Sequence, residues 1–96
     1  MIKHTFVKVG SKKIEAIDLA LAARHLIVLK GSRGYVMCGY LNQSAAEKFK
    51  DAAVKIKGVS SVADALKATV FSCTTAARRL GIRPGQPVRE VLRAIV

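Results

Sequence analysis

The 96 residues predict a single α+β domain, in which an antiparallel sheet comes first and helices follow. Strand-forming segments separated by turn residues fill the first half of the chain, and helical spacing of apolar residues begins after Asn42. The length leaves no room for a second domain. Because 51% of the residues are hydrophobic, a chain of this size can bury one modest core.

The first half of the chain contains four strand-like segments, and tight turns mark two of the junctions between them. β-Branched residues are frequent in the first segment, and Gly10-Ser11 supplies a two-residue turn with glycine at its first central position. Gly31–Gly34 supplies another turn, after a continuously apolar segment. We therefore predict an antiparallel meander of four strands, at Ile2–Val9, Lys13–Leu21, His25–Leu29 and Tyr35–Leu41.

A helix and a short fifth strand are expected next. Asn42 and Ser44 are candidate N-caps, and Ser44 with Glu47 has the spacing of a capping box. The helix is predicted to end near Asp51. The alternating segment Val54–Lys57 then predicts the fifth strand.

Helical spacing continues from Ser61 to Leu80, where the pattern allows one long helix or two shorter ones. Gly81 fits the left-handed position that ends a helix, and Ile82 can fold back in a Schellman contact. Pro87 suits the first turn of a last helix that runs to Ile95. The prediction is thus three or four helices packed against the sheet.

Charge is the strongest compositional signal. Seventeen Lys and Arg against six Asp and Glu leave a net charge of +11, which favours nucleic acid or another polyanion as a partner. The alternative is that the charge serves solubility or reflects a compositional bias. No nucleic-acid recognition motif is present, so binding would be directed at the phosphate backbone and sensitive to salt. The candidate anion-binding residues are Arg78, Arg79, Arg83, Arg89 and Arg93.

Cys38 is the sharpest candidate for chemistry. A nucleophilic thiol needs a nearby cation, a histidine partner or a helix N-terminus. His25, on the adjacent predicted strand, is a candidate base, and Asn42 opens a helix four residues further on. The alternative is that Cys38 fills the core, as Cys73 is expected to do. Gly39, inside the predicted strand, indicates close approach of either a ligand or a packed helix.

Several classes of function are disfavoured. No apolar run reaches the ~20 residues of a membrane-spanning helix, and no signal-peptide core is present, so we expect a cytoplasmic protein without a membrane partner. The two cysteines and two histidines are too far apart along the chain for a zinc-site spacing, so no metal and no cofactor are predicted. Imperfect alternation in the first two strands leaves an edge that can pair with a second subunit, which makes a homo-oligomer plausible.

Two segments point to a family. Gly34–Asn42 reads GYVMCGYLN, and Ala76–Ile95 reads AARRLGIRPGQPVREVLRAI. Together they resemble the YunC-like family, small bacterial and archaeal proteins with a domain of unknown function. The resemblance covers most of the chain and implies an α+β domain. It supplies no activity, cofactor or catalytic residue, and the high positive charge is not part of its pattern.

Two function classes follow from these observations. The leading prediction is a non-enzymatic binding or assembly module that contacts nucleic acid or another polyanion through Lys and Arg. The alternative is a small-molecule enzyme or ligand-binding protein that uses Cys38 in a pocket at the end of the fourth strand.

Overall fold

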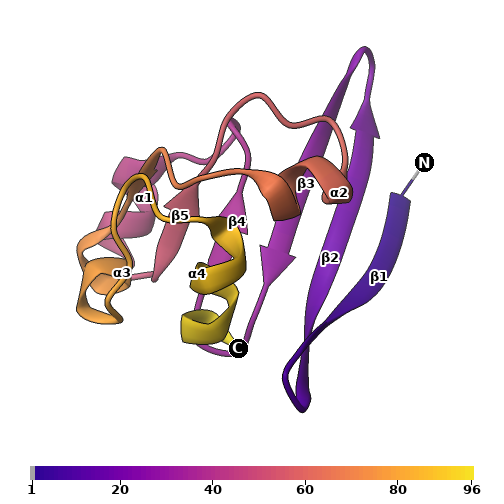
Figure 1. Cartoon of the computed structure of the whole chain (residues 1–96). Coiled ribbons are helices and arrows are strands. Elements are labelled where there is room, and N and C mark those ends of the chain that lie inside the picture. Colours follow the sequence, from indigo (N-terminus) through magenta and orange to yellow (C-terminus); the bar gives the residue numbers. More distant parts are fainter. Residues whose placement is uncertain (1) are drawn as a thin grey trace.

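The computed structural model describes residues 2–96 and confirms the α+β class, with a six-stranded sheet and helices on both of its faces (Figure 1). The spatial order of the strands follows the chain, from β1 to β6. The strands are β1 Ile2–Val9, β2 Lys12–Leu21, β3 Arg24–Lys30, β4 Tyr35–Met37, β5 Ala53–Lys55 and β6 Ser72–Cys73. The helices are α1 Gln43–Lys48, α2 Val62–Lys67, α3 Thr75–Arg79 and α4 Val88–Ile95.

The antiparallel meander of β1 to β4 is confirmed. The two-residue turn at Gly10, which has φ +64°, joins β1 to β2. The fifth strand differs from a continued meander, because β5 runs parallel to β4 after the chain crosses over through α1. A parallel pair needs such a crossover, and α1 supplies it.

The segment from Ser61 to Leu80 is not one long helix, and the sixth strand within it was not predicted. Helix α2 ends at Lys67, and the chain is extended before α3 begins. The main-chain N–H of Phe71 donates to Lys55 O at 2.8 Å, and that of Val70 donates to Gln86 O at 2.9 Å. Tertiary hydrogen bonds therefore override an apolar spacing that suits a helix equally well.

The start of α1 confirms one of the two candidate N-caps, whereas the predicted capping box and the predicted helix end are wrong. Asn42 is the N-cap and its side chain accepts from Ala45 N, whereas the Ser44 capping box does not form, because Glu47 accepts instead from Thr75 N. The helix ends early, at Lys48. Lys50 adopts φ +61°.

The end of α3 agrees with the prediction. Gly81 has φ +90°, and the N–H of Ile82 donates to Ala77 O at 3.2 Å, which completes the expected Schellman motif.

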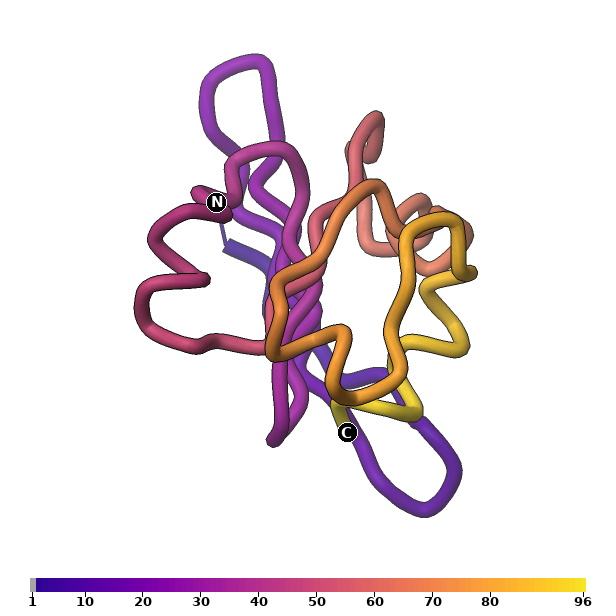
Figure 2. The backbone as a smooth tube through the Cα atoms, turned by 90° about the vertical axis from the view of Figure 1, so that its left-hand side faces the viewer, coloured from indigo at the N-terminus to yellow at the C-terminus, as the bar shows by residue number. Residues whose placement is uncertain are grey.

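Helices cover the two faces of the sheet unequally. Figure 2 shows α1 alone on one side, whereas α2, α3 and α4 lie on the other. The main core lies beneath these three helices, and its largest fully buried side chains include Ile14, Ile27, Leu29, Ile56 and Ile95. Helix α1 packs over β4 and β5 through a small cluster around Ala46, and its Gln43 side chain hydrogen-bonds to Ser72 and Cys73 of β6. None of the helices in residues 2–96 has the length and apolar character needed to cross a bilayer.

Candidate functional site

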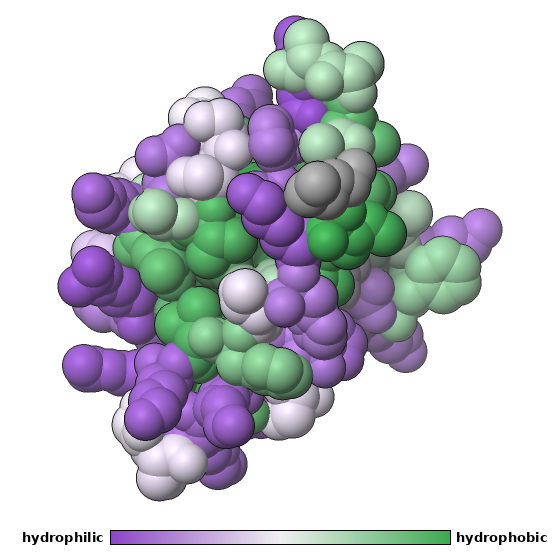
Figure 3. Space-filling view, turned by 90° about the vertical axis from the view of Figure 1, so that its right-hand side faces the viewer, coloured by the Kyte–Doolittle hydropathy of each residue, from purple (hydrophilic) through white to green (hydrophobic). Residues whose placement is uncertain are grey.

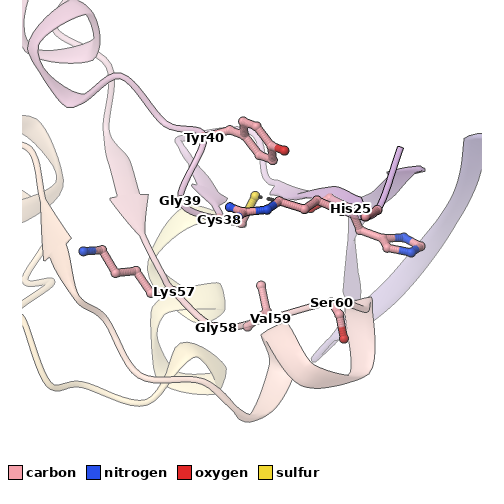
Figure 4. A pocket seen from close by; sticks show the side chains of 10 residues that line it. His25, Cys38, Gly39, Tyr40, Lys57, Gly58, Val59 and Ser60 are labelled. Atoms are coloured by element: carbon pink, nitrogen blue, oxygen red, sulfur yellow. Dashed lines mark hydrogen bonds between the residues drawn. The ribbon is translucent and has the colours of Figure 1, made fainter. Parts of the chain in front are cut away.

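A cavity of about 470 Å³ opens beside the ends of β3 and β4 (Figure 4). Three segments far apart in the sequence form its wall: the turn into β3, the residues that follow β4, and the link from β5 to α2. This volume lies within the range of small-molecule sites. The lining residues are Ala23, Arg24, His25, Cys38, Gly39, Tyr40, Lys57, Gly58, Val59 and Ser60.

Cys38 lies in this wall, but its thiol is held by main-chain atoms of β3. Strand β4 ends at Met37, one residue before it. The thiol donates to His25 O at 3.8 Å and accepts from Ile27 N at 3.5 Å. The residue is only 4% exposed, and its sulfur makes the last hydrogen bonds between β3 and the segment that follows β4.

The structure does not bring the three predicted catalytic side chains together. The His25 ring points away from Cys38 in Figure 4, and its Nδ1 lies 2.6 Å from Asp18 Oδ1. Asn42 caps α1 and does not line the cavity. No Cys–His pair for activating a nucleophile exists in this arrangement.

Gly39 has no packing role in the chain. A Cβ at this position would meet no atom within 4 Å, so no helix packs against it. Its φ also lies outside the left-handed region. The fold does not require glycine here, and the space in front of Gly39 is part of the cavity.

Two further side chains that could take part in chemistry, Lys57 of the cavity wall and Cys73, are engaged in contacts elsewhere. Figure 4 shows Lys57 directed away from Cys38, and its Nζ lies 3.8 Å from the centroid of the Phe71 ring. Cys73 is buried as predicted, although in β6 rather than on a helix. Burial raises the pKa of the Cys73 thiol, so this group stays protonated and unreactive.

A second cavity, of about 320 Å³, lies between β1 and α4 and brings two of the predicted arginines together. Arg89 and Arg93 stand one helical turn apart on α4 and form one side of this cavity. No Asp or Glu lines it. We call it the arginine groove, and its residues are Val7, Lys8, Val9, Gly10, Leu66, Arg89, Leu92 and Arg93.

The other three predicted arginines lie at the end of α3. Arg83 has a structural role there, because its guanidinium donates to Arg78 O and Ile82 O at 2.9 Å each. Arg78 and Arg79 occupy the last turn, where cations stabilise the helix dipole. Arg93 also lies in the last turn of its helix, α4, so the difference is that Arg83 is hydrogen-bonded within this cluster, whereas Arg89 and Arg93 line a cavity.

The positive charges are not neutralised within the chain. In residues 2–96, the cation–carboxylate contacts within 4.0 Å involve only the two histidines, and none involves a Lys or an Arg. Asp51, for example, accepts a hydrogen bond from the Tyr35 hydroxyl. Burial and this hydrogen bond raise the pKa of Tyr35 to about 12, so the hydroxyl stays protonated and remains a donor to Asp51. Four of the six Asp and Glu residues are hydrogen-bonded to other groups: Asp18 to His25, Glu47 to Thr75, Asp51 to Tyr35 and Asp64 to Ser60.

Residues 37–95 match the family described as a domain of unknown function, DUF1805. The chain belongs to this family. It is 29% identical to the uncharacterized protein YunC of Bacillus subtilis over 96% of this chain and 95% of that one, which confirms the resemblance seen in the sequence. The crystal structure of TA1206, a protein of unknown function from Thermoplasma acidophilum, matches with a TM-score of 0.95 and 34% identity. That match covers 100% of this chain and 94% of the other.

The DUF1805 match includes some parts of both cavities and leaves out others. Cys38, Gly39 and all five candidate arginines lie inside residues 37–95, whereas β1, β2 and β3 lie outside. The TA1206 likeness, however, spans every element of this chain. The strands that complete both cavities therefore belong to the fold shared with that protein.

Proposed function

We propose that this protein is a non-enzymatic binding module for phosphate-bearing polyanions, nucleic acid above all, and that the arginine groove is its main contact. One observation supports this most: the Lys and Arg side chains in residues 2–96 have no carboxylate within 4.0 Å. A surface of this kind attracts polyanions and binds them mostly through their phosphates.

The arginine groove concentrates this charge. Arg89 and Arg93 repel one another at an i, i+4 spacing, at a cost of a few tenths of a kcal/mol. A phosphate between them replaces that repulsion with charge-assisted hydrogen bonds, which are the stronger kind. Because both side chains are exposed and have no competing carboxylate, the pair is free to make these bonds.

The first prediction concerns the salt dependence of binding. Replacement of both groove arginines (R89Q/R93Q) is expected to weaken binding of a fluorescent RNA or DNA oligonucleotide and to lower the slope of log K against log salt by about 2. The control R24Q/K48Q removes the same number of charges from the turn into β3 and from α1. Fluorescence anisotropy across a salt titration measures both variants.

Comparison of the two double variants shows whether binding depends on the arginine groove itself or only on the net charge of the protein. Equal losses in the two double variants would show that only net charge matters and that the arginine groove is not the contact. Absence of binding by the unmodified protein to RNA and DNA at low salt would overturn the polyanion function altogether.

The cavity beside Cys38 supports a second candidate function, the binding of a small molecule. Its volume suits such a ligand. Because Gly39 has no side chain, a ligand in the cavity can approach the main chain there, and the fold itself does not require glycine at this position. Catalysis by Cys38 would require a reactive thiol, and the main-chain contacts of that thiol argue against one.

Alkylation of Cys38 tests the catalytic version. In a Cys73→Ser variant, we expect iodoacetamide to modify Cys38 much more slowly than free cysteine at the same pH, because the residue is almost fully buried. Mass spectrometry after timed quenching measures the rate, with the urea-unfolded variant as the control. Modification faster than that of free cysteine would instead support an enzyme.

A further inference from the structure

We propose that two copies of this protein pair through β1, so that the two sheets join into one antiparallel sheet around a two-fold axis. β1 is an eight-residue strand at the edge of the sheet, with β2 on one side and, within residues 2–96, no strand on the other. Unpaired edges of this length readily accept another strand, and proteins usually shorten or cover them.

The hydrogen bonding of β1 determines which groups face outwards. In an antiparallel pair, hydrogen-bonded and non-hydrogen-bonded residue pairs alternate, and a two-residue turn places the bonded pair beside it. Val9 and Lys12 flank this turn and are partners. The residues of β1 that bond to β2 are therefore the odd-numbered ones, and the outward N–H and C=O groups belong to Ile2, His4, Phe6 and Lys8.

These four residues define one best register for a second β1. With Thr5 on the two-fold axis, Ile2 lies opposite Lys8 of the second copy and His4 opposite Phe6, so all four outward residues are used. A shift of two residues leaves at least one of them without a partner. In the Thr5 register no lysine faces a lysine, which matters because directly opposed like charges destabilise a sheet.

Side chains on the face of β1 that is turned away from the main core suit this arrangement. His4 and Phe6 already form an aromatic pair, with centroids 5.2 Å apart, and Phe6 is 58% exposed. In the Thr5 register the second copy adds its own pair beside this one, which gives a cluster of four rings. Ile2, 67% exposed, lies on the same face.

The apolar surface also continues past the edge on both sides. Figure 3 looks onto the β1 edge and shows green surface on each side of a purple band. On the helix side, Val7 lies next to Leu66 and Leu92 in the arginine groove. A strand added to β1 extends both faces at once, whereas a partner placed on one face would cover only one apolar region.

Pairing through β1 also has a consequence for charge. The two-fold axis is perpendicular to the joined sheet, so the helices of both copies lie on the same side. The two arginine grooves flank the paired strands and present four arginines to one polyanion. The proposed dimer depends only on contacts made by β1, so it does not require the proposed polyanion binding to be correct.

A cysteine placed on the axis tests both the dimer and its register. Non-hydrogen-bonded partners have Cα atoms about 4.5 Å apart, within the range of a disulfide. We therefore expect Thr5→Cys to form a covalent dimer under mild oxidation and Lys3→Cys, on the same face of β1, to form much less. The native cysteines are buried and serve as an internal control. Cross-linking of Lys3→Cys at least equal to that of Thr5→Cys would overturn the register.

Sedimentation velocity tests the association itself. The unmodified protein is expected to sediment as a species of about twice 10.3 kDa as its concentration rises. Proline is tolerated on an edge strand where its nitrogen faces outwards, so His4→Pro should fold normally yet dissociate about tenfold more readily than His4→Ala. Circular dichroism checks the fold. A protein that stays monomeric at every concentration, or equal dissociation of the two variants, would overturn the proposal.

Discussion

Replacement of Gly31 by alanine is expected to destabilise the protein by about 3 kcal/mol, because the new Cβ would collide with main chain. That Cβ would lie 2.2 Å from Ile95 O and 2.6 Å from Ile95 C. Main-chain atoms cannot rotate away, so the β3–β4 turn would have to separate from the end of α4. The separation would break the hydrogen bond from Arg33 N to Ile95 O and that from Ser32 Oγ to Val96 O.

Gly39→Ala is the matched control for this variant. A Cβ at Gly39 meets nothing within 4 Å, so its effect should stay within about 0.5 kcal/mol. Urea denaturation at equilibrium measures both variants, and the difference between their midpoints gives the comparison. If Gly31→Ala unfolds at the same urea concentration as Gly39→Ala, the close approach of α4 to this turn is not part of the stable fold.

Glycine positions also show how far a single sequence predicts the fold. Gly10 and Gly81 were assigned correctly because each serves its own neighbours, as the corner of a hairpin and the end of a helix. Gly31 was predicted only as a turn residue. Its second role is contact with Ile95, 64 positions away, and no local pattern contains such information.

Helix ends and short strands were missed for related reasons. Lys50 takes the left-handed position after α1, where glycine is the usual signal, so the sequence places the helix end too late. β6 has only two residues and depends on pairing with β5. Apolar residues at Val70 and Cys73 suit a helix stripe as well as this strand, and only the tertiary partner decides between them.

The sequence led to a pocket at the end of the fourth strand, but not to the way its side chains are arranged. A cavity lies at the end of β4 beside Cys38, as the ligand-binding alternative requires. The sequence could not show that the His25 ring turns towards Asp18, since side-chain direction depends on the neighbouring strand. The i, i+4 spacing of Arg89 and Arg93 made them candidates for anion binding, which stays a prediction, and the structure places both on one cavity. The sequence could not show that these two arginines lie beside β1, because α4 and β1 are at opposite ends of the chain and only the folded structure brings them together.

Thr74 is the position where loss of one oxygen atom is expected to cost most. Its residue is fully buried, and its Oγ1 donates to Asp51 O at 2.7 Å and accepts from Ala53 N at 3.0 Å and Ala77 N at 3.3 Å. These bonds cap α3 and hold it to the start of β5. No pattern in the sequence marks Thr74 apart from its suitability as an N-cap.

Thr74→Val keeps the shape of the side chain and removes all three hydrogen bonds, so we expect a destabilisation of about 3–4 kcal/mol. Most of this cost comes from the main-chain groups of Asp51 and Ala53, which lose their side-chain partner inside the protein. Thr74→Ser retains the oxygen and loses one methyl group, which should cost about 1 kcal/mol. Urea denaturation of the two variants isolates the hydroxyl, since valine fills the space and serine keeps the bonds. Equal stability of the two would show that the junction of α3 with β5 depends on packing rather than on this oxygen.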